Sequence, residues 1–198
     1  MLDFDNFCNN LTYTGFGNNG SLRKFYKDIS GGLLDYQNVV YGYYCAPLTF
    51  AQYDAMPYAQ GAQQILGQAL NWLDSQGFDF STLSTNPDGS IMAINLMYTG
   101  TPPNWAQGMW HHKGNYTGFS ADGVTSNDYN CSPAGSPLRL AVVAHENGHM
   151  IGKWPDTYKY DNTTGPDGIG GFDLMCDYGS YTNPTIPNPL FRGNAGWG

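Results

Sequence analysis

The chain has 198 residues, 41% of them hydrophobic, which is enough for one large domain or two small lobes around a buried core. Its formal net charge is −8, with only 8 Lys and Arg and no basic run, which argues against nucleic acid as a partner. No apolar stretch approaches membrane-spanning length, and the 26 glycines and 12 prolines indicate many long loops.

The first half of the chain carries patterns for two helices and one strand. Residues 22–29 can form a short helix that ends at the glycines after Ser30. Residues 39–44 are rich in valine and tyrosine, which favours a β-strand. Residues 58–76 predict the first long helix, because apolar residues recur at spacings of three and four and Gly77 can stop the helix.

The second half carries two further strand patterns. Residues 91–98 predict a more apolar strand, which follows the turn Asn86-Pro87-Asp88-Gly89. Residues 108–112 are a third candidate strand, and residues 118–136 are expected to form a loop.

The next segment predicts a buried helix. Ser136 is a suitable N-cap and Pro137 a suitable first helical residue, because proline is tolerated where the N–H would be unpaired. Residues 138–144 are almost continuously apolar, which is typical of a helix inside the protein. Gly152 is expected to end this helix in a left-handed turn.

The most informative motif of this helix is His145-Glu146-Asn147-Gly148-His149, which contains the only glutamate of the chain. At a helical spacing of four, the two imidazoles lie on one face and can reach a single Zn²⁺. Glu146 lies beside that face, where it can act as general base on a metal-bound water. The same five residues can also occur on an ordinary solvated helix, but the apolar run before them favours a metal site.

Together with later residues, this motif resembles the M6 peptidase family, the secreted metalloproteases similar to immune inhibitor A. The matching core is residues 145–152, followed by Pro155-Asp156 and Tyr158. Phe172-Asp173-Leu174-Met175 is similar to the family's Asp-Leu-Met segment, which makes a turn with a methionine beneath the metal. Weaker similarities cover residues 21–34, 40–43, 79–100 and 110–112.

The resemblance implies an α+β, zincin-like fold of two lobes, with a mixed sheet, a long backing helix and an active-site helix. We expect one catalytic domain over residues 1–198, with an upper lobe of about 1–152 and a lower lobe of about 153–198. We expect a secreted, monomeric zinc endopeptidase that acts on protein or peptide substrates, with no membrane span and with its leader peptide outside this sequence.

The resemblance also implies a ligand set for Zn²⁺, namely His145, His149 and Asp156. Family members have two residues between the motif glycine and the ligand aspartate, whereas three stand here. Asp161 and Tyr158 are therefore alternatives to Asp156 as the third ligand.

Zinc peptidase chemistry needs further groups near the metal. A donor to the developing oxyanion is required, and the candidates are Tyr178, Tyr181 and His112. Each can instead be a packing or loop-anchoring residue. Asp173 is expected to support the turn rather than bind the metal. Calcium is a further candidate cofactor, although the family's aspartate-rich turn is reduced here to residues 86–89.

Two other functions remain open. One is a catalytically silent binding or adhesion module that keeps zinc for stability, but a structural site would not need a general base such as Glu146. The other is a hydrolase restricted to glycopeptide substrates.

The cysteines are widely spaced and form no Cys-x-x-Cys pair, which disfavours a zinc cluster of thiolates. Because the resemblance implies a secreted protein, two disulfides are the leading hypothesis, and free buried thiols are the alternative. The favoured pairs are Cys8 with Cys45 and Cys131 with Cys176.

Overall fold

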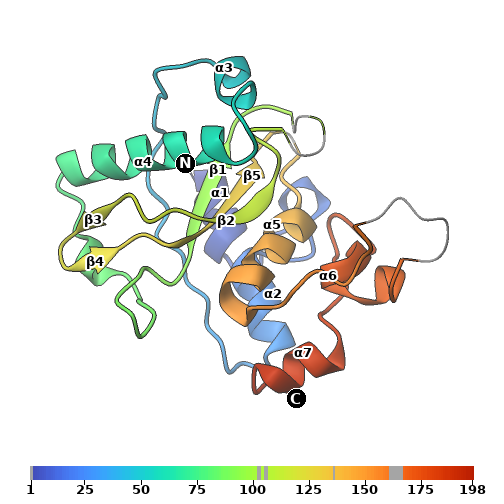
Figure 1. Cartoon of the computed structure of the whole chain (residues 1–198). Coiled ribbons are helices and arrows are strands. Elements are labelled where there is room, and N and C mark those ends of the chain that lie inside the picture. The colour runs from blue at the N-terminus through green and yellow to red at the C-terminus, as the bar shows by residue number, and fades with distance from the viewer. Residues whose placement is uncertain (1, 102–103, 105–106, 136, 161–166) are drawn as a thin grey trace. The chain divides into compact units, whose positions relative to one another are not determined.

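A computed structural model gives the structure of the chain (Figure 1) and describes residues 2–101, 104, 107–135, 137–160 and 167–198. It has an α+β architecture with several helices and a small mixed sheet, which confirms the predicted class. The chain divides into two compact units, one formed by residues 1–42 and 136–198 and the other by residues 43–135. The lobe boundary expected near residue 152 falls inside the first unit and stays a prediction.

The first unit is helical. Its helices are α1 (Leu2–Asn9), α2 (Leu22–Ile29), α5 (Leu140–Asn147), α6 (Leu174–Asp177) and α7 (Pro189–Asn194). Short 3₁₀ turns lie at Gly15–Gly17 and Gly170–Phe172, and a π-helical turn, Gly148–Gly152, follows α5.

The second unit contains the sheets. Its elements are α3 (Phe50–Asp54), α4 (Gln60–Ser75), a 3₁₀ turn at Phe80–Thr82, β1 (Ile94–Tyr98), β2 (His112–Asn115), β3 (Ser120–Ala121), β4 (Val124–Thr125) and β5 (Asp128–Pro133). In the larger sheet the order is β1-β5-β2, with β1 parallel and β2 antiparallel to β5, while β3 and β4 form a separate hairpin.

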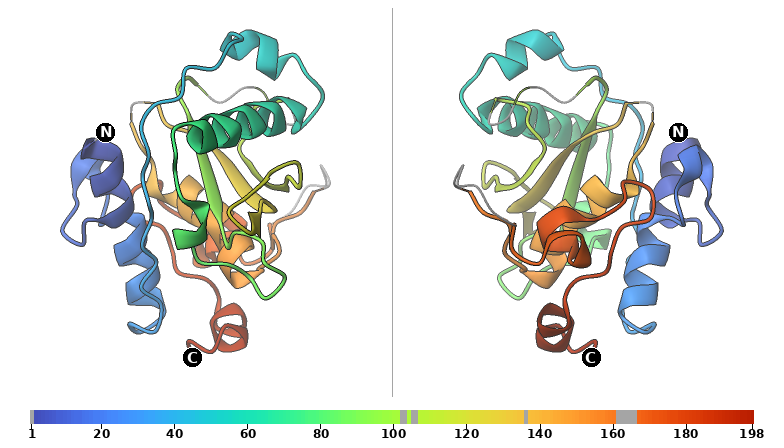
Figure 2. Two further views of the ribbon diagram at one scale, coloured as in Figure 1. Left: turned by 90° about the vertical axis from the view of Figure 1, so that its left-hand side faces the viewer. Right: turned by 90° about the vertical axis from the view of Figure 1, so that its right-hand side faces the viewer.

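Helix α4 lies across one face of the larger sheet (Figure 2). Its apolar stripe is buried because it packs with the inward-facing residues of the strands in one hydrophobic core. The core members from α4 and the sheet include Ala62, Ile65, Leu66, Leu70, Tyr98, Tyr129 and Cys131. The stripe predicted for residues 58–76 is therefore the core face of this helix.

Central strand β5 contradicts the loop predicted for residues 118–136. The strand carries Asp128, Asn130 and Ser132, which are all buried. Asn130 donates a 2.9 Å hydrogen bond to Asn95 and accepts one of 2.6 Å from Ser132, while Asp128 pairs with Lys113 at 2.8 Å. Because hydrogen bonds rather than apolar packing satisfy these side chains, the hydrophobic periodicity of a strand is missing.

The other predicted elements differ in how well they match. The helix at residues 22–29 is α2, and the long helix at 58–76 is α4, slightly shorter. The strand predicted at 91–98 is confirmed as β1, which begins at Ile94, whereas β2 begins only at the last residue of the 108–112 candidate. Residues 39–44 belong to no strand of the described structure.

Cys8, Cys45, Cys131 and Cys176 are free cysteines in the structure. Each favoured pair would join the two units, and the pairing stays a prediction. Three of these side chains are buried and Cys45 is exposed. Burial, with a smaller effect of Asp5, raises the pKa of Cys8 to about 12, so this thiol stays protonated near neutral pH. Among the described helices, none is both long enough and apolar enough to cross a lipid bilayer.

Candidate metal centre

Helix α5 carries the first three residues of the motif, His145-Glu146-Asn147, and all eight of its residues are buried. Helix α2 lies beside it (Figure 1). The Tyr26 hydroxyl donates a 2.7 Å hydrogen bond to the Ala144 carbonyl, and the Tyr36 hydroxyl donates one of 2.7 Å to Asn147 Oδ1. These bonds fix the part of the helix that presents the motif.

The start of α5 is held by residues distant in sequence. The helix begins at Leu140, later than predicted, and the proposed cap Ser136 lies outside the described residues. The Leu140 N–H donates to Asn18 Oδ1 at 3.0 Å, and the Ala141 N–H donates to the Tyr181 carbonyl at 3.0 Å. Free N–H groups at a helix start need such acceptors, and here Asn18 replaces a local cap.

The π-helical turn after α5 carries His149 and packs tightly. A Cβ at Gly152 would lie 2.2 Å from the Trp154 ring, and one at Gly148 would lie 2.9 Å from Met175 Sδ. The left-handed residue is Lys153 (φ 53°, ψ 31°), not Gly152 as predicted. These glycines are therefore required by close packing rather than by their backbone angles. The methionine of the Asp-Leu-Met segment lies against this turn.

The two motif histidines are oriented by backbone carbonyls. His145 Nδ1 lies 2.9 Å from the Leu174 carbonyl, and His149 Nδ1 lies 2.6 Å from the Trp154 carbonyl. A carbonyl only accepts hydrogen bonds, so each Nδ1 carries the proton and each neutral ring keeps a lone pair on Nε2. This arrangement is the one that metal-binding histidines adopt, because it leaves Nε2 available as the ligand atom.

Asp156 faces both of these nitrogens. Its Oδ1 lies 3.0 Å from His145 Nε2 and 3.3 Å from His149 Nε2. This buried oxygen nevertheless makes no hydrogen bond of acceptable geometry with any described residue. Ligand atoms at about 2.0–2.1 Å from a tetrahedral Zn²⁺ would be about 3.3 Å apart, and the two distances from Asp156 Oδ1 are close to that spacing.

The charge state of the centre supports the same interpretation. Burial disfavours ionisation of Asp156, but the adjacent rings of His145 and His149 and the Tyr160 hydroxyl outweigh it and hold the pKa of this carboxyl well below its ordinary value. Burial would lower the pKa of His145, but Asp156 and Glu146 outweigh it and raise that pKa. The centre therefore stabilises one additional positive charge, which a proton or a metal cation can supply.

Glu146 completes the cluster. Possible ligand atoms of His145, Glu146 and His149 lie within 4.8 Å of one another, and this is the single such group of three found in the described residues. Two ligand sets are conceivable, with either Glu146 or Asp156 beside the histidines. The short distances from Asp156 Oδ1 to both Nε2 atoms favour Asp156, which leaves Glu146 near the metal position for proton transfer.

Asp173 supports the turn and is fully buried. Its Oδ1 accepts hydrogen bonds from the N–H groups of Met175 (3.2 Å) and Asn188 (3.1 Å). Its Oδ2 accepts from Thr157 Oγ1 (2.9 Å) and Asn188 Nδ2 (2.8 Å). Both oxygens are thus occupied, which agrees with a supporting role. Thr157 follows Asp156, and Leu174 orients His145, so Asp173 connects the segments that hold two expected ligands.

Tyrosine side chains surround the centre. The Tyr178 ring meets the His145 ring edge-on, with the ring centroids 6.1 Å apart. The Tyr158 ring stacks on the same imidazole, with the centroids 6.3 Å apart. Burial, followed by hydrogen bonding with Tyr181, raises the pKa of Tyr178, so this side chain is a neutral O–H donor. Tyr178 therefore lies beside the centre, and the ring of Tyr181 packs against that of Tyr178 with the ring centroids 5.3 Å apart.

His112 belongs to the second unit, where both of its ring nitrogens have partners. Nδ1 donates to the Trp110 carbonyl, and Nε2 lies 2.7 Å from the Tyr129 hydroxyl. Burial lowers the pKa of His112, so the ring is neutral at pH 7. These contacts are those of a residue that anchors β2, and a catalytic role for His112 stays a prediction.

The sequence interpretation missed Asn18, Tyr36 and Tyr160, which hold α5 and Asp156. No local pattern marks them, because the first two act across more than a hundred positions. The alternative ligand Asp161 lies outside the described residues. At the expected calcium turn, Asp88 Oδ1 accepts hydrogen bonds from the Ser90 N–H (2.9 Å) and hydroxyl (2.6 Å), and calcium stays a prediction.

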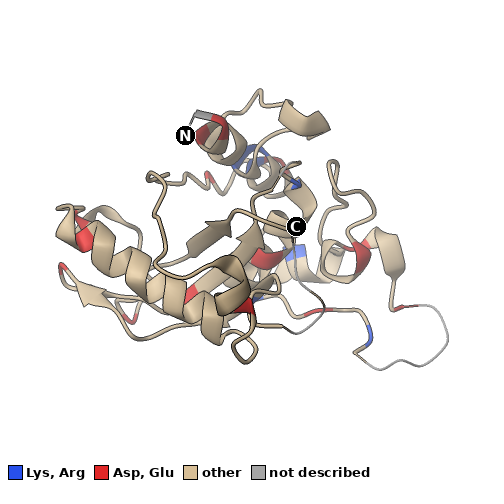
Figure 3. Cartoon of the chain, turned by 90° about the horizontal axis from the view of Figure 1, so that it is seen from above, with Lys and Arg blue, Asp and Glu red and all other residues tan. Residues whose placement is uncertain are grey.

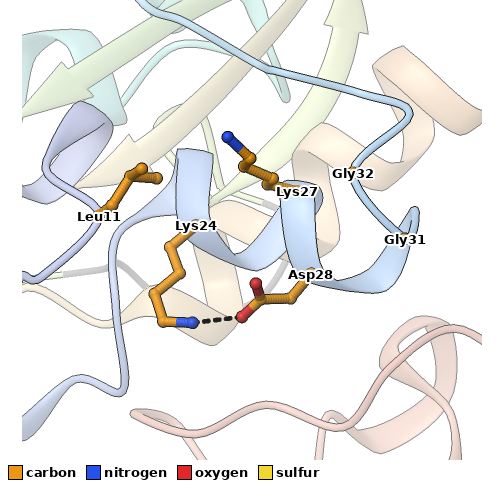
Figure 4. Close-up of a pocket in the computed structure, with 6 residues that line it drawn as sticks. All are labelled: Leu11, Lys24, Lys27, Asp28, Gly31 and Gly32. Carbon is orange, nitrogen blue, oxygen red and sulfur yellow. Dashed lines mark hydrogen bonds and ion pairs between the residues drawn. The ribbon is translucent and has the colours of Figure 1, made fainter.

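A surface depression of about 430 Å³ lies over α2 (Figure 4) and includes no residue of the metal centre. It is lined by Leu11, Lys24, Lys27, Asp28, Gly31 and Gly32. Lys24 forms an ion pair with Asp28 across it. Basic residues are few in the chain, and α2 carries three of them, Arg23, Lys24 and Lys27 (Figure 3). Three of the six lining residues are charged, and two of these are paired with each other.

No protein-family model matches the chain, and no curated protein matches it. The function must therefore be inferred from the geometry of the centre itself and from the motifs quoted above.

Proposed function

We propose that this chain is the catalytic domain of a zinc-dependent endopeptidase with a zincin-like fold, as its resemblance to the M6 peptidases suggests. The observation that carries the proposal is the position of Asp156 Oδ1, buried and without a hydrogen bond, beside the Nε2 atoms of His145 and His149. Three acceptor atoms so close together repel one another unless a cation lies between them. Two imidazoles and one carboxylate are a ligand set of catalytic zinc sites.

Each residue of the centre has a role in this proposal. His145, His149 and Asp156 would hold the zinc ion, which when bound polarises the substrate carbonyl and lowers the pKa of a bound water to ~7. Glu146 accepts the proton of the attacking water and returns it to the leaving amine. Tyr178 presents an O–H group that can donate to the developing oxyanion.

Protein or peptide substrates and export from the cell belong to the same proposal. They rest on the resemblance of the His-Glu-x-x-His and Asp-Leu-Met segments to those of secreted peptidases. The competing function, a silent binding module, needs the same ligands but no general base. Glu146 therefore distinguishes the two functions.

The test is the variant Glu146→Gln, assayed with casein and a peptide library after loading with zinc. We expect hydrolysis to fall by about 10²–10⁴-fold, because the base is lost. Zinc should remain at one per chain, because no expected ligand has changed. His149→Ala is the matched variant, and it should lose both zinc and activity.

Equal turnover by wild type and Glu146→Gln would exclude the peptidase mechanism. A wild-type chain that binds zinc but cleaves none of these substrates would favour the binding module.

A further inference from the structure

The second oxygen of Asp156 has a partner of its own. The Tyr160 hydroxyl donates a hydrogen bond to Asp156 Oδ2, while Oδ1 faces the two histidines. Tyr160 is 72% exposed, so its ring adds little to the core and its hydroxyl makes its main contact with the centre. This combination is unusual for a residue needed only for folding, because an exposed ring contributes little burial energy.

Tyr160 is in turn held by Tyr158. Their rings lie 5.1 Å apart, and the Tyr158 hydroxyl hydrogen-bonds to that of Tyr160. Tyr158 also stacks on His145, with ring planes 22° apart. The hydroxyl groups of Tyr158 and Tyr160 therefore both adjoin the Asp156 carboxylate, while the Tyr158 ring lies against His145.

The alternative supports of Asp156 act elsewhere. Asp173 holds the neighbouring Thr157 through its hydroxyl, and the Thr157 N–H donates to the Met175 carbonyl at 2.9 Å. These bonds fix the backbone after Asp156 but do not touch its carboxylate. Rotation of the carboxylate about its last bond is therefore limited by the tyrosine hydroxyls, of which that of Tyr160 holds Oδ2.

We propose that Tyr160 is a positioning residue that fixes Asp156 as a one-oxygen ligand and thereby keeps a coordination position open for water. A carboxylate can bind a cation through one oxygen or through both, and the tyrosine hydroxyl occupies Oδ2 so that Oδ1 alone faces the metal. The inference rests on the proposed zinc site, but it concerns ligand geometry rather than the reaction catalysed.

The experiment uses the full chain and the variant Tyr160→Phe, which removes only the hydroxyl. Zinc affinity is measured by competition with a chelator, and coordination by the visible absorption of the Co²⁺-substituted protein. We expect zinc to bind about 10–100-fold more weakly, as is typical when the partner of a ligand is lost. The Co²⁺ spectrum should also change in band position and intensity, because the ligand geometry changes.

Two further variants make the result specific. Tyr158→Phe should also weaken zinc binding, but less, because Tyr160 still holds Asp156 Oδ2 in that variant. Tyr13→Phe is the control, since the buried Tyr13 hydroxyl makes no hydrogen bond with any described residue. It should leave zinc affinity and the Co²⁺ spectrum unchanged.

The outcomes separate this inference from the proposed function. If wild type binds one zinc per chain and Tyr160→Phe shows the same affinity and the same Co²⁺ spectrum, the positioning role is overturned and the zinc site stands. If wild type itself binds neither zinc nor Co²⁺, the proposed function fails and this inference fails with it.

Discussion

At the scale of single residues, glycines determine the packing of the centre as much as the expected ligands do, because they have no side chain. Gly152 allows the Trp154 indole to lie directly against the turn that carries His149. Trp154 is itself fixed, because its Nε1 donates to the Phe191 carbonyl at 3.2 Å and its ring stacks on Phe191. The Trp154 carbonyl, which orients His149, therefore depends on a packing contact that only glycine permits.

Gly152→Ala should lower stability by about 1–3 kcal/mol, because the added methyl group would meet the Trp154 ring in a tightly packed site. Zinc affinity should fall as well if the backbone of Trp154 shifts with its ring, because the Trp154 carbonyl orients His149. Thermal unfolding and chelator competition measure the two effects. Gly193→Ala is the matched control, because a Cβ there meets nothing within 4 Å. A Gly152→Ala protein as stable as the control would disprove this packing constraint.

At the scale of elements, α5 depends on a cap supplied by a distant segment. Asn18 is almost fully buried, accepts from the Leu140 N–H and donates to the Leu138 carbonyl at 2.9 Å. It therefore satisfies one donor and one acceptor at the helix start, where a local serine or aspartate would usually satisfy the donor.

Asn18→Ala should reduce stability by about 1–3 kcal/mol, because it leaves buried backbone groups without partners. Chemical denaturation of the zinc-loaded protein measures this loss. The control is Asn183→Ala, which removes an exposed hydrogen bond to Asn19 and should have little effect. Similar losses of stability in both variants would show that the buried Asn18 cap stabilises the protein no more than the exposed hydrogen bond does.

The elements also show how much the sequence could reveal. Helices α2 and α4 were predictable because their apolar stripes and stop signals are local. The motif, its two histidines and the nearby aspartate were likewise readable from spacing and resemblance. Three features were not predictable from the sequence: strand β5, the capping of α5 by Asn18, and the contact from Tyr160 to Asp156. Each depends on hydrogen bonds of polar residues whose partners are known only from the folded chain.

At the scale of the whole molecule, all the expected zinc ligands belong to the first unit. A metal that binds only the folded form stabilises it by about 2.7 kcal/mol when its concentration is 100 times Kd. Because the ligands lie in α5, the turn after it and the following loop, this stabilisation should suppress local opening there first.

Hydrogen exchange with and without zinc can test this expectation. Removal of zinc by a chelator should speed amide exchange in residues 140–157 and 174–177. In residues 43–135, the rate of amide exchange through local opening should stay nearly constant. Equal acceleration in both units would show that the metal stabilises only global unfolding or is bound elsewhere.

The division of the first unit between the two ends of the chain has a consequence for biosynthesis. The second unit is one continuous stretch, so all of it is translated before the motif helix. Asn18 is made early but must wait for Leu140, which is 122 positions later. His145 gains its orienting carbonyl only when Leu174 has emerged. During synthesis the motif centre can therefore be completed only after the sheet-bearing unit has been translated, so the nascent chain would reach this stage before it could bind the proposed zinc ion.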